Sequence, residues 1–290
     1  MSTAEIIFEF FRITIGVTRL LFRTYFIIFF LSCCSTKAAS AQTAPAPSGP
    51  EIVTDRPTVT PAPFVVPTNY VQAENGLVLR KEHAGGSFNV PQTQIRLGVL
   101  PRTELRLAVP NYFLIRGGQE NISAVADMSV GVKIQLGPLP GKIDLAVIPG
   151  FTMPTGSKAL TTGAVDPFVQ ITAARRLSEN WTLGSAHSIF LQTEAAETQV
   201  QGVTTNQRSV IYQPTCVLFR KLGPRADLFT EYAGNFTKGK LSDQIMDAGA
   251  VYRFRRNQQL GIRLGAGLTK ASPTAFVEFG YSFLLGKIIR

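Results

Sequence analysis

Charged side chains that could bind or select ions recur along this sequence at alternate positions of apolar stretches. Glu104 and Arg106 flank Leu105, and Lys133 lies between two aliphatic residues. A ring of one sign would indicate an ion filter, whereas a set of both signs indicates an interior salt-bridge network or a pore with a transverse field. The candidate site is such a mixed set: Glu74, Arg80, Arg96, Glu104, Arg106, Asp127, Lys133, Asp144, Asp166, Glu231, Asp247, Arg263 and Glu278.

Ser185 and His187 are the residues that most resemble a catalytic pair, because they share the apolar parity of one stretch. Residues i and i+2 of a strand lie about 7 Å apart, which is too far for a direct hydrogen bond. The sequence has no Gly-x-Ser-x-Gly elbow, and its two histidines are His83 and His187. We therefore expect no enzyme activity, no cofactor and no metal site, and keep an outer-membrane lipase as an alternative.

Long β-strands must position these side chains, and their pattern is clearest at the end of the chain. Between residues 259 and 268, Leu260, Ile262 and Leu264 alternate with polar residues or glycine. This period of two belongs to a strand and not to a helix. The alternation restarts at residue 274 and places aromatic residues on its apolar parity up to residue 285. Each strand is about ten residues long, which suffices to cross a bilayer when tilted. A long hairpin of a soluble sandwich is the alternative.

The same period predicts an all-β fold, a closed antiparallel up-and-down transmembrane β-barrel of about twelve strands. Long outer loops, including 82–91, 112–123 and 193–208, alternate with short turns, as in outer-membrane barrels. Unpaired edge amides would face hydrocarbon, so the last strand should pair with the first. The charged face must line the lumen, because Arg or Lys at the bilayer midplane costs about 2–4 kcal/mol. The predicted strands are 70–81, 92–100, 103–111, 124–137, 142–153, 165–176, 181–192, 209–219, 226–235, 244–254, 258–268 and 274–285.

Residues 1–41 are predicted to be a signal peptide. Residues 22–34 contain a short apolar run preceded by Arg12, Arg19 and Arg23, and residues 39–41 are the small Ala-Ser-Ala of a cleavage site. A non-cleaved anchor helix and a lipoprotein modified at Cys34 are the alternatives. Cleavage lowers Lys+Arg from 29 to 25 and Asp+Glu from 19 to 17, so the net charge falls from +10 to +8. Cys216 then remains as the lone cysteine, which argues against a disulfide.

A proline-rich segment, residues 42–69, precedes the predicted barrel of residues 70–290. Its first 26 residues, 42–67, hold seven prolines, so it should be extended and lie outside the sheet. It is either a periplasmic leader or a strap that enters the barrel, and residues 42–50 could also be a disordered tail. We predict that Asp55 and Arg56 dock into the luminal charges, so that this segment plugs or gates the lumen.

Short motifs extend over roughly residues 53–285, and each is weak alone. They are Asp55-Arg56-Pro57, Pro67, Gln72, Glu74, Gly76, Arg96, Gly98, Glu104-Leu105-Arg106, Gly131, Lys133, Pro154-Thr155-Gly156-Ser157, Asp166-Pro167, Glu231, Asp247, Gly249, Tyr252, Gln259-Leu260, Gly265-Ala266-Gly267-Leu268-Thr269 and Pro273. Together they resemble the MetA-pathway of phenol degradation family of outer-membrane transporters. The resemblance implies a barrel that takes up hydrophobic or aromatic compounds. The chain departs from the family pattern at Gly261, at Ser272 and in its tail, 286–290.

The expected function is that of an outer-membrane channel or transporter through which small hydrophobic or aromatic solutes pass passively. The expected partners are outer-membrane lipid and lipopolysaccharide, the outer-membrane insertion machinery and the solute. Export argues against nucleic acid, and attraction to anionic lipid headgroups accounts better for the basic balance. The alternative is a non-conducting structural or interaction barrel whose outer loops bind lipopolysaccharide or a partner. The expected location is the outer membrane of a Gram-negative bacterium.

Overall fold

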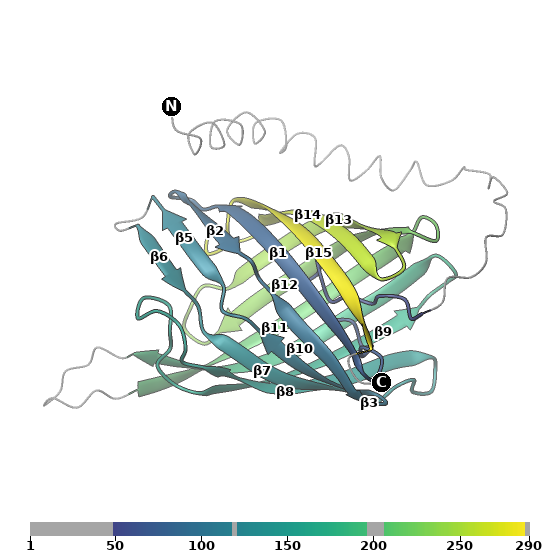
Figure 1. The fold of residues 1–290 in the computed structure, drawn as a ribbon. Helices are drawn as coiled ribbons and strands as arrows, with labels where there is room; N and C mark the ends of the chain where they lie inside the picture. Colours follow the sequence, from purple (N-terminus) through teal and green to yellow (C-terminus); the bar gives the residue numbers. More distant parts are fainter. Residues whose placement is uncertain (1–48, 118–120, 196–205, 288–290) are drawn as a thin grey trace, which may run out of the picture. The chain divides into compact units, whose positions relative to one another are not determined.

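The computed structural model describes residues 49–117, 121–195 and 206–287, which form a closed antiparallel β-barrel (Figure 1). The predicted fold class is therefore confirmed. Within these ranges, no helix is long and apolar enough to cross a membrane. The predicted signal peptide, residues 1–41, lies outside the described residues.

The wall has twelve strand positions, because three of them are each occupied by two short strands in line. These pairs are β2 with β3, β4 with β5, and β6 with β7. The strands are β1 Tyr70–Lys81, β2 Gly86–Val90, β3 Gln94–Leu100, β4 Thr103–Ala108, β5 Tyr112–Arg116, β6 Ile122–Val125, β7 Met128–Gln135, β8 Ile143–Met153, β9 Asp166–Arg176, β10 Trp181–Ala195, β11 Asn206–Lys221, β12 Ala226–Thr237, β13 Asp243–Arg255, β14 Gln258–Gly267 and β15 Ala275–Lys287.

The first and last strands close the barrel. β1 pairs with β15 over its whole length, with Leu77 opposite Phe279 and Glu74 opposite Ser282. The predicted alternation of faces is confirmed here, because Phe279 is 49% exposed whereas Glu74 and Glu278 are buried. The outward row is apolar and the inward row is polar, so the barrel satisfies its edge hydrogen bonds and presents a lipid-compatible surface.

The regular strand pairing of the wall is interrupted near Pro91 and Pro110. The predicted strand ends are wrong in this region. β2 pairs with the outer half of β1, where Lys81 lies opposite Gly86, and β3 pairs with its inner half. Proline cannot donate a ladder hydrogen bond, so the regular pairing is broken there. Single bonds still join the strands, such as those from the Gly76 amide to the Pro91 carbonyl at 2.7 Å and from the Val109 amide to the Thr93 carbonyl at 2.9 Å. About half of the chain predicted as outer loops 82–91 and 112–123 is strand, namely β2, β5 and the start of β6. Loop 193–208 is also shorter than predicted, because β10 reaches Ala195 and β11 begins at Asn206.

The two ends of the barrel differ in the length of their connections. Short turns at 101–102, 177–180, 222–225 and 256–257 and the seven-residue connection 136–142 lie at one end, on the right in Figure 1, and the long loop 154–165 lies at the other. In outer-membrane barrels the short turns face the periplasm. We use this orientation to name the periplasmic and outer ends.

Candidate functional site

Residues 51–66, here called the luminal loop, lie inside the barrel, and the two ends of this loop meet at the periplasmic end. Ile52 and Val66 pack with Leu284 in a buried apolar cluster, and the Ile52 amide donates to the Arg256 carbonyl at 2.9 Å. None of residues 51–66 belongs to a strand. Because buried backbone groups need partners, the side chains of the wall must supply them.

One group of wall residues, here called the Arg96 cluster, contacts the loop from β1, β3, β4 and β7. Arg96 is fully buried, and its guanidinium contacts Glu104 at 2.8 Å and Glu74 at 2.7 Å. Asp55 of the loop lies 2.6 Å from Arg106 and 3.0 Å from Lys133. The cluster thus has three carboxylates and three cations: Asp55, Glu74, Glu104, Arg96, Arg106 and Lys133.

The Arg96 cluster also binds the backbone of both ends of the loop. Arg96 donates to the carbonyl oxygens of Val53 at 3.0 Å and Phe64 at 2.9 Å. Lys133 donates to the Ala62 carbonyl at 2.7 Å, and Glu104 accepts the Val66 amide at 2.7 Å. The same side chains therefore neutralise one another and satisfy the loop backbone, which offsets the cost of burying them.

A second group, here called the Arg263 cluster, contacts the loop from β12 to β15. Arg263 contacts Glu278 at 2.7 Å, Asp247 at 3.2 Å and Glu231 at 3.6 Å. Arg56 of the loop contacts the other oxygen of Glu278 at 2.8 Å. Two cations thus meet three carboxylates, so the cluster carries a formal charge of −1.

Glu231 holds the middle of the loop. Its two oxygens accept the backbone amides of Val59 and Thr60, each at 2.7 Å. Thr60 also donates its hydroxyl to Glu231 and contacts the Thr215 hydroxyl at 2.7 Å. The loop therefore runs from the Arg96 cluster across to Glu231 and back.

Asp55 keeps its negative charge in this setting. Burial alone would raise the pKa of the Asp55 carboxyl, but the positive charges of Arg96, Lys133 and Arg106 outweigh burial and hold the pKa well below its ordinary value. Asp55 also accepts the Ala62 amide at 2.9 Å, and its own amide donates to Glu74 at 3.0 Å. Asp55 is thus an ionised anchor between the wall and the far arm of the loop.

The other predicted site residues lie apart from the two clusters. Arg80 lines a small cavity nearer the outer end, and Asp144 has the inward parity of β8 without joining either cluster. Asp166 is buried near the outer rim and accepts hydrogen bonds from Thr193. Asp127 lies between β6 and β7 and accepts the amides of Gly156 and Thr162, so it fixes the outer loop that follows β8.

Sequence reasoning missed several uncharged residues that bind the loop. Gln72 donates to the Val53 carbonyl at 2.9 Å, Gln259 to the Thr54 hydroxyl at 2.6 Å, and Thr172 to the Pro61 carbonyl. Gln92 accepts from Arg56 at 2.6 Å. Gln72, Gln259 and Thr172 share the inward parity of the charged set, so a search of that parity for amides and hydroxyls would have found them.

Ser185 and His187 do not contact each other. The Ser185 hydroxyl donates to the Thr215 carbonyl at 2.8 Å, and the His187 ring lies 2.7 Å from the Tyr212 hydroxyl. His187 is exposed on the outward face of β10. Each side chain therefore has a partner other than the one a hydrolytic pair would need.

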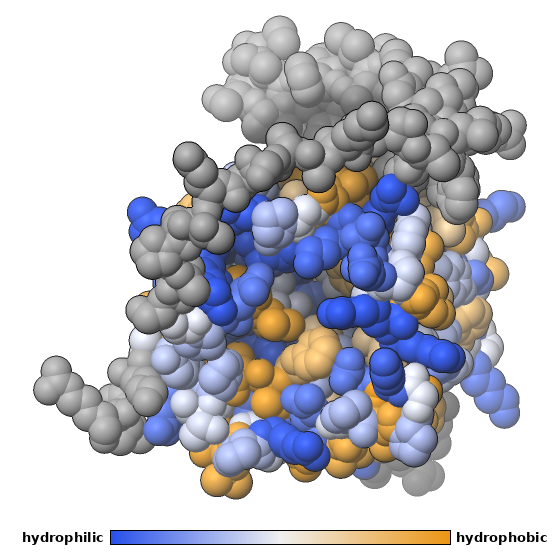
Figure 2. All heavy atoms as spheres, turned by 90° about the vertical axis from the view of Figure 1, so that its right-hand side faces the viewer, coloured by the Kyte–Doolittle hydropathy of each residue, from blue (hydrophilic) through white to orange (hydrophobic). Residues whose placement is uncertain are grey.

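Cavities lie on both sides of the luminal loop. One of about 390 Å³ lies between the loop and the inner wall of β9–β13. Nearer the outer end are cavities of about 180 Å³, lined partly by Phe168 and Phe190, and about 130 Å³, lined partly by Val59 and Phe276. Figure 2 faces the periplasmic end and shows a hollow rimmed mainly by hydrophilic side chains, with hydrophobic side chains inside.

Residues 54–285 match the family described as "Putative MetA-pathway of phenol degradation". The chain belongs to this family. No curated protein matches the sequence. Among solved structures, an outer membrane channel from Pseudomonas putida F1 has 14% identity and a TM-score of 0.55, with 76% of this chain and 97% of the channel covered. The NanC porin has 8% identity and a TM-score of 0.50, with 73% and 98% covered. These likenesses show the barrel fold, and this family member is an outer-membrane protein.

Two glycines explain how this family member accommodates its loop. A Cβ atom at Gly98 would lie 2.2 Å from the Pro67 carbonyl oxygen and 2.4 Å from that of Val66. At Gly261, where the sequence departs from the family pattern, a Cβ atom would lie 3.0 Å from the Pro57 ring. At these two positions the wall has no side chain, which leaves room for the Val66–Pro67 backbone and for the Pro57 ring.

Proposed function

We propose that this outer-membrane barrel is a channel for small hydrophobic or aromatic solutes, which cross passively through a lumen lined by mixed charges, and that the luminal loop gates it. The observation that carries the proposal is the division of the lumen. Val59 borders a cavity toward the outer end, while its neighbours Thr58 and Thr60 line the cavity toward the periplasm. A solute passing through the lumen must therefore move past the loop or displace it.

The loop is suited to such movement, because its central part is held by wall side chains and by a few bonds within the loop, such as those of the Thr58 hydroxyl to the Asp55 and Thr60 carbonyls. A β-strand plug would have to break a continuous ladder, whereas the residues around Val59 lose two backbone hydrogen bonds to Glu231. Segments with few backbone ladder contacts belong to the low-stability part of a structure. The wall, in contrast, is paired strand to strand from β7 through β15 to β1, with register shifts only near the periplasmic end, at Tyr70 and between Tyr252 and Arg255.

The cavity beside Phe168 and Phe190 supports the choice of solute. The two rings lie 5.6 Å apart and, with Ile148, give the cavity an apolar side, while Arg106 and Gln170 are among the polar residues that line the rest. Its floor includes Gln94 and Ala108, the residues next to the interruption of the wall. This position supports a second route, in which a hydrophobic solute enters from the side through the interruption instead of from the outer end.

A dye-entry assay tests the proposal. We expect that a Gram-negative host expressing the protein takes up the hydrophobic dye N-phenyl-1-naphthylamine faster than cells with an empty vector, and that entry accelerates further when residues 42–60 are deleted. Entry of a hydrophilic sugar should change little. If the dye enters at the same rate in all three strains while the barrel is folded, the non-conducting interaction barrel is the better account.

A further inference from the structure

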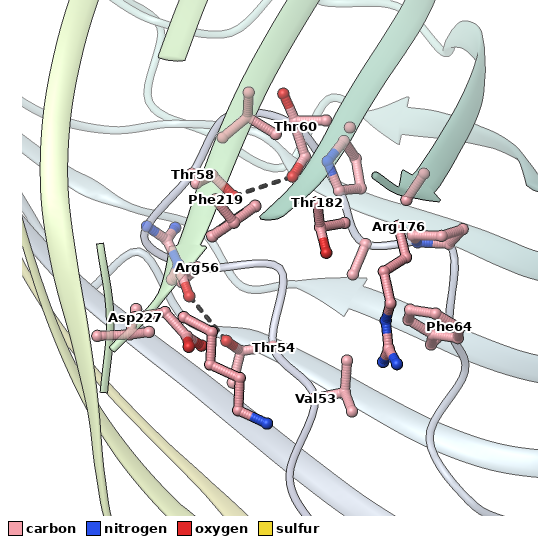
Figure 3. Close-up of a pocket in the computed structure, with 18 of the residues that line it drawn as sticks. Val53, Thr54, Arg56, Thr58, Thr60, Phe64, Arg176, Thr182, Phe219 and Asp227 are labelled. Carbon is pink, nitrogen blue, oxygen red and sulfur yellow. Dashed lines mark hydrogen bonds between the residues drawn. The ribbon is translucent and has the colours of Figure 1, made fainter. Parts of the chain in front are cut away.

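The cavity of about 390 Å³ at the periplasmic end has an apolar patch on its inner wall, while its loop side carries Thr54, Thr58 and Thr60. Val217 and Val251 belong to a buried cluster on the inner wall, and Phe219 packs against it. Phe64 of the luminal loop lines the cavity as well, and in the view of Figure 3 it lies on the same side as Arg176, with Arg56 and Asp227 on the other. A cavity of this size is typical of small-molecule sites, which span about 300–1,000 Å³.

The charged groups around this cavity fall into two kinds. Arg56 is bound to Glu278, and Arg253 contacts Asp227 at 2.7 Å and Glu51 at 3.5 Å. In the described part of the chain, the side chains of Arg176 and Lys221 have no ion-pair partner and are exposed at the rim. One acidic residue, Glu179, lies on the adjoining turn. The two rim side chains without an ion-pair partner, Arg176 and Lys221, are therefore the positive groups available to bind a ligand.

The register places the two free cations near each other. Arg176 of β9 lies opposite Thr182 of β10, which lies opposite Phe219 of β11, two residues before Lys221. Two strand spacings and an offset of two residues separate the backbones by about 12 Å, which two long side chains can span to reach one anion. Arg253 lines the same cavity, but its Nε atom faces Glu51 at 3.5 Å and its guanidinium contacts Asp227, so Arg176 and Lys221 are the cations left for a ligand.

We propose that this cavity binds an amphipathic carboxylate, with its hydrocarbon part against Val217, Phe219 and Val251 and its carboxylate between Arg176 and Lys221. The inference rests on the proposed function, because it makes the cavity the last binding site before the periplasm. The apolar patch of Val217, Phe219 and Val251 favours a hydrocarbon against the inner wall, and the unpaired cations at the rim favour an anion over a neutral or cationic amphiphile.

The test is equilibrium binding of radiolabelled decanoate to the mature protein in lipid nanodiscs, with empty nanodiscs subtracted. Decanol is the neutral probe of the same length. The variant is R176Q/K221Q, and the matched control is R175Q, because Arg175 neighbours Arg176 on the outward face of β9. We expect R176Q/K221Q to weaken decanoate binding by about fivefold to tenfold, with decanol binding unchanged and R175Q like the wild type.

Equal binding of decanoate and decanol, or equal loss in R175Q and R176Q/K221Q, would overturn the inference. Dye entry distinguishes this failure from failure of the proposed function. If deletion of residues 42–60 accelerates dye entry but decanoate binds no better than decanol, the channel function is supported and the carboxylate site is rejected. If decanoate binding depends on Arg176 and Lys221 but the protein admits no dye, the carboxylate site is supported and the channel function is rejected.

Discussion

The Arg96 cluster and the Arg263 cluster both hold the luminal loop, but they differ in charge and in the part of the loop that they contact. The Arg96 cluster balances three carboxylates with three cations and binds both arms of the loop, at Val53, Asp55, Ala62, Phe64 and Val66. The Arg263 cluster has an excess carboxylate and binds Arg56 and the bend at Val59 and Thr60. The balanced side is therefore the anchor, and the acidic side is the one suited to release.

The largest expected difference between the clusters is in stability. Glu104→Gln removes a buried carboxylate that binds Arg96, Arg106 and the Val66 amide, so we expect a loss of about 3–5 kcal/mol. Asp247→Asn removes the excess negative charge, and one Asp247 oxygen has no hydrogen-bond partner. We expect that change to cost less than about 1 kcal/mol. Urea unfolding in detergent micelles, followed by the fluorescence of Trp181, measures both. Equal losses would remove the distinction between the clusters.

The next largest expected effect is on conductance, and it compares substitutions at two neighbouring residues of the loop. Asp55 is buried and meets Arg106, Lys133 and Arg96, so Asp55→Asn should weaken docking by about 3–5 kcal/mol. Arg56 is 23% exposed and has one carboxylate partner, so Arg56→Gln should weaken docking by about 1 kcal/mol. Single-channel recordings should show a higher conductance or open probability for Asp55→Asn. A larger effect of Arg56→Gln would reverse the assignment of the anchor.

A pair of glycine substitutions tests the close approach of the loop to the wall. Gly98→Ala would place a methyl group against the carbonyls of Val66 and Pro67, which must shift, at a cost of about 1–3 kcal/mol. Gly280→Ala is the matched control, since its nearest atoms would lie 3.6 Å away, at ordinary contact distance. Protease protection of the loop should fall in Gly98→Ala alone. Equal protection in both variants would mean that the loop does not lie against β3.

The smallest expected effect is that of a moderate decrease in pH on docking of the luminal loop. The pKa of Asp55 in the folded protein is held well below its ordinary value of 3.8. The contribution of Asp55 to docking is therefore fully present at any pH above 3.8. It is lost only when the pH falls through the lower folded-state pKa. Lowering the pH from 7 to 5 should therefore leave the contribution of Asp55 unchanged. Comparing wild type with Asp55→Asn at both pH values isolates it, and a gap in conductance that narrows at pH 5 would contradict the prediction.

The sequence was sufficient to predict the barrel because lipid on one side and a polar lumen on the other impose a strict period of two. The alternation around Arg263 and Glu278 thus placed both inward before their partners were known. The interruption near Pro91 and Pro110 could not be predicted. The strands before and after each proline have ordinary lengths, and the alternation of apolar and polar residues does not show where regular pairing resumes. The docking of the loop was equally hard to read, since most of its bonds use backbone groups, such as the Phe64 carbonyl and the Val59 amide, which carry no sequence signal.

The central claim is that the luminal loop closes the lumen, and single-channel recording in planar bilayers tests it most directly. The mature protein is compared with the same protein lacking residues 42–60, which removes Asp55, Arg56 and the Glu231 contacts while leaving every strand in place. We predict a severalfold higher conductance for the shortened protein. An unchanged conductance from a folded barrel would contradict the account.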